Sequence, residues 1–203
     1  MVVAMSRKPS RVLLAGAALA LGLGIVLVAM MGGDDGAFEV VQAWGVARNA
    51  GDIDAALALV SEDARLLDHS MQLPERRDAF VELLRVQASA GWEVHDFDCS
   101  IAGESVACRY EQSDVFLRMM GLVLTGNHEY VVRDGLIVSA DRTHNPESRS
   151  AIGSAWRDLR QWVKERHPEI EPVIWTSRGS VAYSTVEGVE ATLSIFDEYL
   201  AAK

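Results

Sequence analysis

Residues 40–54 read VVQAWGVARNAGDID, and this stretch predicts one helix, its end and the start of a second helix. Side chains recur here at the spacing of one helical face, from Val41 through Trp44 to Arg48. The run Asn-Ala-Gly at 49–51 is typical of a helix end, because glycine readily adopts the left-handed conformation that closes a helix. Asp52 is a residue type that caps helix N-termini, so we expect a second helix over residues 53–60.

Beyond this stretch, the spacing of apolar residues changes from helical to strand-like at Trp92 and becomes helical again at residue 150. A third helix is expected at 76–90. From Trp92 the apolar period is two, which predicts antiparallel strands at 92–101, 105–112, 122–132 and 136–142. Helical spacing returns at 150–166 and 186–200, with an extended segment at 172–176 between them. Helices, an antiparallel meander and two further helices predict an α+β fold: a curved antiparallel sheet covered on one face by N-terminal helices, whose concave side encloses a pocket.

The two cysteines, Cys99 and Cys108, flank a predicted hairpin turn at Gly103-Glu104. Counting outward from that turn places them opposite each other at a non-hydrogen-bonded pair, where side chains on adjacent strands are closest. A cross-strand disulfide is therefore feasible, and an oxidising compartment would favour it. Two buried thiols on one face of the hairpin fit the same spacing.

Residues 12–31 form an uncharged apolar run of twenty residues, the length of a transmembrane helix. Basic side chains precede it within residues 1–11, and Asp34 and Asp35 follow it. The positive-inside rule then predicts a cytoplasmic N-terminus at 1–11, a membrane anchor at 12–31, a linker at 32–36 and an extracytoplasmic remainder. The alternative is a cleaved signal peptide and a secreted domain.

Charge and motif content exclude several function classes. Residues 34–203 contain all 29 acidic side chains but only 16 of the 19 basic ones, so their formal charge is −13. Such a surface repels nucleic acid. We find no nucleotide-binding glycine loop, no metalloprotease motif and no cysteine pair at zinc spacing, and we expect neither a cofactor nor a metal ion.

Residues 40–64 resemble the opening of the nuclear-transport-factor-2-like superfamily, in particular its ketosteroid isomerases and SnoaL-like polyketide cyclases. The later segments around 108–114 and 132–137 look like the meander of the same superfamily. This resemblance implies a conical domain at 37–148, followed by a C-terminal helical extension at 149–203 that packs on it. It also implies homodimerisation through the sheet.

The resemblance carries over to individual residues only in part. It places Asp68 where the isomerases have their proton-shuttling carboxylate, and Trp44 where they have an oxyanion-binding tyrosine. The third site position of the isomerases, where they have a protonated acid, falls near Asn127 or His128. Isomerisation next to a ketone needs a base to move the proton and donors to hold the enolate oxygen. We therefore take Asp68 and His128 as the candidate catalytic pair, although a histidine satisfied within the sheet fits the pattern as well.

The candidate ligand-binding residues are Trp44, Tyr110 and Asn127, with simple core packing as the alternative for the two aromatic residues. The apolar connection at 115–124 either lies exposed, at the mouth of the cone or against a partner or the membrane, or is buried under the C-terminal helices.

Three functions follow from these observations. The first is a membrane-anchored extracytoplasmic module that binds a small hydrophobic molecule in its cone. The second is an isomerase or cyclase acting on a steroid-like or polyketide-like carbonyl compound, with Asp68 as base. The third is a non-catalytic assembly module of a membrane complex.

Overall fold

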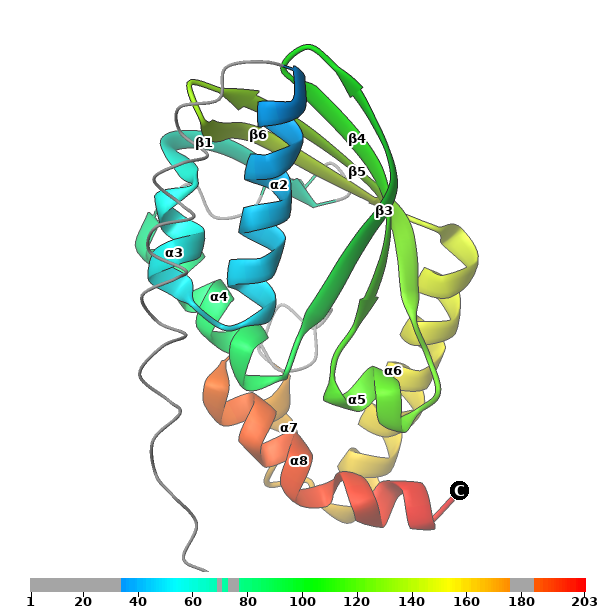
Figure 1. Ribbon diagram of the computed structural model, residues 1–203. Helices are drawn as coiled ribbons and strands as arrows, with labels where there is room; N and C mark the ends of the chain where they lie inside the picture. Colours follow the sequence, from blue (N-terminus) through cyan, green and yellow to red (C-terminus); the bar gives the residue numbers. More distant parts are fainter. Residues whose placement is uncertain (1–33, 69–70, 73–76, 176–184) are drawn as a thin grey trace, which may run out of the picture.

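The computed structural model describes residues 34–68, 71–72, 77–175 and 185–203 of the chain (Figure 1). The predicted helices are present as α2 (Asp34–Asn49), α3 (Ile53–Ala58) and α4 (Arg77–Ser89). Gly51, at φ +68°, follows α2, and the Asp52 carboxylate accepts a hydrogen bond from Ala55 N at the start of α3. Helix α2 begins at Asp34, so the last three residues of the expected linker are helical.

In the described part of the chain, the sheet has six strands in the order β2-β1-β6-β5-β4-β3. Their bounds are β1 (Val60–Asp68), β2 (Met71–Gln72), β3 (Glu93–Ala102), β4 (Ser105–Ser113), β5 (Leu124–Arg133) and β6 (Leu136–His144). The last four form the predicted antiparallel meander. Strand β1, however, pairs in parallel with β6, so the sheet is mixed and the expectation of a wholly antiparallel sheet was wrong.

Strand β1 also corrects the predicted helix at 53–60, because α3 ends at Ala58 and the chain is extended from Val60. The reason is tertiary. The register pairs Val60 with Ile137 and Leu66 with Ala140, far along the sequence. The spacing of apolar residues within one segment does not indicate that the segment will pair in parallel with a strand far along the sequence.

The hairpin of β3 and β4 confirms the disulfide between Cys99 and Cys108. Ala102 pairs with Ser105 across the predicted turn, and Gly103 has φ +60°. The register shifts between Phe97 and Ser100, next to Asp98 at φ +49°. The strand therefore bulges beside the disulfide, a local irregularity that the simple count from the turn did not include.

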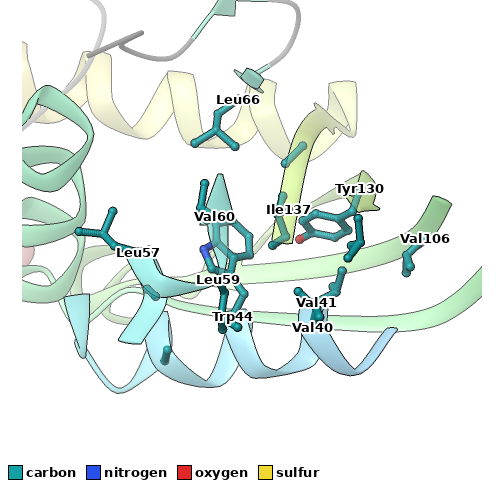
Figure 2. Close-up of a cluster of buried hydrophobic side chains, with 14 of the residues drawn as sticks. Val40, Val41, Trp44, Leu57, Leu59, Val60, Leu66, Val106, Tyr130 and Ile137 are labelled. Carbon is teal, nitrogen blue, oxygen red and sulfur yellow. The ribbon is translucent and has the colours of Figure 1, made fainter. Parts of the chain in front are cut away.

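Helix α2 lies across one face of the curved sheet and builds the main core (Figure 1). Figure 2 shows Trp44 of α2 beside Tyr130 of β5, with Val41 and Ile137 close to them. The rings of Trp44 and Tyr130 meet edge to face, with centroids 5.8 Å apart. Trp44 and Tyr130 are 6% and 2% exposed, so α2 and the sheet are packed together without solvent at this point.

Among its described residues, the C-terminal extension forms three helices, not two: α6 (Pro146–Arg166), α7 (Glu171–Ile174) and α8 (Val186–Ala201). The extended segment expected at 172–176 is helical up to Ile174, since Pro172 stands in the first turn of α7, where proline is tolerated. These helices build a second core with the end of α4, through side chains such as Leu159, Phe196 and Val86.

The apolar connection at 115–124 contains a short helix, α5 (Val115–Met119). Phe116 is fully buried against Trp156 of α6 and Phe196 of α8, with ring centroids 5.8 and 5.2 Å away. Burial under the C-terminal helices therefore accounts for the centre of this segment. Met119 and Val123 remain exposed.

Within the described residues, no helix is both long enough and apolar enough to cross a membrane. The predicted anchor at 12–31 lies outside those residues.

Candidate functional site

A hollow lies between the sheet and helices α2 and α4; its volume is about 40 Å³ when only the space open to the centre of a water molecule is counted, and about 420 Å³ when the open solvent at its mouth is included. Part of its wall is apolar, formed by Leu66, Phe80, Leu83, Ala140 and the two indoles of Trp44 and Trp92. The rest is polar and is formed by Arg48, Gln87, His128, Tyr130, Asp141 and Arg142. An apolar hollow with a few convergent polar groups is the usual form of a small-molecule site.

Two polar residues of the cavity wall, His128 and Tyr130, form a hydrogen-bonded triad with Asp96. His128 Nδ1 lies 2.6 Å from Asp96 Oδ1, and the Tyr130 hydroxyl donates to Asp96 Oδ2 at 2.9 Å. The Tyr130 oxygen is also 2.8 Å from His128 Nδ1. Residues 128 and 130 point to the same face because side chains alternate along β5, and Asp96 reaches them from β3.

Burial sets the protonation of this triad. Desolvation lowers the pKa of His128, against the opposing effect of Asp96 and with the help of Arg142 and Arg48. The imidazole is therefore neutral at pH 7. Because a carboxylate only accepts, we assign the Nδ1 proton to the bond with Asp96, which leaves Nε2 with its lone pair. Burial, followed by the charge of Asp96, raises the pKa of Tyr130, so its hydroxyl stays protonated.

Tyr110 supports the imidazole from the neighbouring strand β4. Its ring stacks on His128 with centroids 4.2 Å apart and an interplanar angle of 15°. Its hydroxyl oxygen lies 2.5 Å from His144 Nδ1. The ring of His128 is thus held on its face by Tyr110 and at its edge by Asp96, which fixes its orientation.

Two guanidinium groups complete the polar wall. Arg48 lies between the indoles of Trp44 and Trp92, 4.2 and 4.7 Å from their ring centroids, and donates to Gln87 Oε1 at 3.2 Å. Arg142 lies 5.2 Å from the centroid of Trp92 and donates to Gln112 Oε1 at 2.7 Å. Burial lowers the pKa of Arg48 to about 10, so it is still a cation at neutral pH.

Two donors on α2 are buried without a hydrogen-bond acceptor: Trp44 Nε1 and Arg48 Nε. Asp141 Oδ1 is likewise buried without a donor. Buried polar groups without partners are rare in proteins, and each calls for an explanation.

The cavity brings together two of the predicted site residues, Trp44 and His128. Tyr110 lies behind His128 and does not line the cavity. Asn127 is exposed, and alternation with His128 places it on the other face of the sheet. Asp68 ends β1 beside Arg142 in the parallel register, and its side chain lies outside the described part of the structure.

Sequence reasoning missed Arg48, Asp96, Tyr130 and Arg142 as site residues. Two of them had a local signal, since Arg48 is one helical turn after Trp44 and Tyr130 is two strand positions after His128. Asp96 had none, because it reaches the site only through the pairing of β3, β4 and β5. No group of three or more metal-binding side chains occurs among the described residues.

Comparison with known proteins identifies the domain. The SnoaL-like domain family matches residues 41–140. Among solved structures, SalBIII, described as an epoxide hydrolase/cyclase-like enzyme in pyran ring formation in salinomycin, is 19% identical over 58% of this chain and 97% of its own, with a TM-score of 0.51. A candidate polyketide cyclase from Xanthomonas campestris pv. campestris is 27% identical over 57% of this chain and 94% of its own, with a TM-score of 0.43.

An NTF2-like protein from Cytophaga hutchinsonii is 14% identical over 55% of this chain and 91% of its own, with a TM-score of 0.46. No curated protein matches the sequence significantly. The likeness to SalBIII supports the fold, while the family match supports the assignment of the domain. The chain therefore belongs, through residues 41–140, to the SnoaL-like branch of the nuclear-transport-factor-2-like superfamily.

Proposed function

We propose that this SnoaL-like domain binds a small hydrophobic molecule in its cone. The observation that carries the proposal is the cavity itself: an open hollow with an apolar wall, into whose lining a buried indole N–H is built without an acceptor. A bound ligand with an oxygen acceptor would cover the apolar wall and satisfy that donor.

Native mass spectrometry of the purified full chain tests this proposal against a panel of steroids and aromatic polyketides. Leu83→Trp adds volume to the partly buried wall of α4 and should abolish the added ligand mass. Leu193→Trp, at an exposed position of α8, is the matched control and should retain it. The absence of any bound mass in the unmodified chain across the panel would contradict the proposal.

A second candidate function is an isomerase or cyclase acting on a carbonyl compound, with Asp68 as base and His128 as its partner. The neutral imidazole held by Asp96 favours it, because Nε2 can accept a proton at pH 7. The base would take a proton from the carbon next to the carbonyl. The resulting enolate oxygen would accept a hydrogen bond from Trp44 Nε1 before the proton is returned to another carbon.

Deuterium exchange at that carbon, followed by NMR in heavy water, distinguishes an enzyme from a binder. Asp68→Asn should abolish exchange into a bound ketone while leaving its affinity nearly unchanged, because the amide keeps the size of the side chain but is not a base. Exchange that persists in Asp68→Asn would refute this mechanism.

A third candidate, the assembly module, is less favoured by the cavity. A purely structural cone would be filled by its own side chains, and this one retains open space beside Trp44 and His128. Capture of a ligand in the mass spectrometry experiment would count further against it.

We also propose that the domain is held outside the cytoplasm by an anchor at 12–31. The Cys99–Cys108 disulfide supports this placement, because such bonds persist mainly in oxidising compartments. Alkaline phosphatase fused after Lys203 should be active in bacterial cells, and membranes should retain the fusion. Activity in the soluble periplasmic fraction would indicate signal cleavage instead, and an inactive fusion would contradict the placement.

A further inference from the structure

Arg48 lines the cavity, and its positive charge has no counterion within the described part of the chain. It forms no ion pair there, and its side chain donates a hydrogen bond to the neutral Gln87 amide. A guanidinium carries five N–H donors, and Arg48 Nε is buried without any acceptor. The group is therefore only partly satisfied by the protein.

Asp96, the carboxylate that acts electrostatically on Arg48, does not serve as its counterion. Asp96 is engaged through Oδ1 by His128 and through Oδ2 by Tyr130, and it forms no ion pair with Arg48. It still attracts Arg48 at longer range, while Arg142 repels it. The acidic chain, with a formal net charge of −10, thus has a local cationic wall inside its cone.

The aromatic side chains around Arg48 make it a rigid group. Trp44 and Trp92 flank the guanidinium at 4.2 and 4.7 Å, which restricts its position and shields it from water. Rigid and poorly hydrated guanidinium groups are well suited to planar oxyanions, because their N–H groups match both oxygens of a carboxylate.

Trp44 Nε1 adds a second donor on the same helix. Trp44 is 6% exposed, lines the same cavity and has no acceptor for its N–H. The two unsatisfied groups of these cavity-lining residues of α2 are therefore both donors. A ligand that satisfies them must present accepting oxygens and, to neutralise Arg48, a negative charge.

We propose that Arg48 and Trp44 form a carboxylate-binding subsite, so that the ligand is an amphiphilic acid whose apolar body lies against Leu66, Phe80 and Leu83. This inference rests on the proposed binding function and narrows it to one chemical class. The carboxylate would pair with Arg48, and its apolar part would extend along the wall formed by α4 and β1.

Isothermal titration calorimetry on the full chain tests the inference with two matched pairs: naphthylacetic acid with naphthylacetamide, and cholanic acid with cholanamide. Each pair shares its apolar body and differs in charge. The acid should bind about tenfold more tightly than the amide, or better, since charge-assisted hydrogen bonds to a desolvated guanidinium contribute more than neutral ones.

Arg48→Met should remove this preference and leave the affinity for the amides within about twofold. Arg48→Lys, which keeps the charge, should retain part of it. Arg109→Met is the matched control, because Arg109 is exposed on β4 and pairs with Asp98 away from the cavity, and it should retain the full preference. Circular dichroism verifies that each variant is folded.

Equal affinities of acid and amide for the unmodified chain would overturn the inference and leave the binding function intact. Retention of the preference in Arg48→Met, or an equal loss of affinity for acid and amide, would also overturn it. Failure of both members of both pairs to bind would overturn the inference and contradict the binding of apolar molecules as well.

Discussion

His128 Nδ1 and Asp96 Oδ1 lie 2.6 Å apart although 32 positions separate the two residues in the sequence. The strand between them, β4, contributes Tyr110, which stacks on the same imidazole. Three adjacent strands thus orient one neutral histidine at the wall of the cavity. The stability of the fold should depend on the charge of that histidine.

The first prediction concerns pH. Because burial lowers the folded-state pKa of His128 below its ordinary value of 6.5, the unfolded chain binds more protons than the native one between the two pKa values. The stabilising effect of neutral His128 is therefore complete above pH 6.5 and declines as the pH falls toward the lowered pKa. The melting temperature should fall over that range.

His128→Gln should reduce this pH dependence, measured by differential scanning fluorimetry from pH 8 to pH 5. His95→Gln, at an exposed histidine on β3, is the control and should keep it. Parallel melting curves for the unmodified chain and His128→Gln across the whole range would show that His128 is not the group responsible.

The second prediction concerns the disulfide. Removing the bond between Cys99 and Cys108 in a Cys99→Ser/Cys108→Ser double variant should destabilise the fold by roughly 2–3 kcal/mol, the loop-closure entropy of so short a ring. Urea unfolding of the two proteins measures the difference. Dithiothreitol should destabilise only the unmodified chain, and an equal response of both proteins would exclude a structural disulfide.

The third prediction contrasts two glycines. A Cβ at Gly126 would collide with the backbone oxygen of Thr143 and lie 2.8 Å from Tyr110 Cε1. Gly126→Ala should therefore destabilise the protein by about 1–3 kcal/mol or more. Gly45, inside α2, has nothing within 4 Å of an added Cβ, and Gly45→Ala should stabilise by roughly 0.5–1 kcal/mol. Chemical denaturation measures both, and equal effects would contradict the close approach at Gly126.

The fourth prediction concerns the C-terminal extension. Phe196 of α8 is fully buried against Phe116, so Phe196→Ala should cost about 3–5 kcal/mol of unfolding free energy. Leu193→Ala, on the exposed side of the same helix, should change it by no more than about 0.5 kcal/mol. Guanidinium unfolding followed by tryptophan fluorescence compares them. Similar values would mean that α8 does not depend on this core.

Local sequence determined those parts of the fold that depend on neighbouring residues. The helix end at Gly51, the cap at Asp52, the turn at Gly103 and the meander of β3 to β6 all follow from backbone preference and short apolar periods. The disulfide followed for the same reason, since a hairpin turn sets the register of its two strands.

Tertiary structure alone decided the parallel pairing of β1 with β6 and the membership of the candidate site. Trp44 and His128 were predicted for it from a family resemblance, but Asp96 and Arg142 reach it only through strand pairing across the sheet. The physical reason is that the local spacing of residues indicates only which face of its own helix or strand a side chain occupies. Which distant side chain it meets, and whether that side chain is charged, depends on how the elements pack and on the burial that follows from the packing.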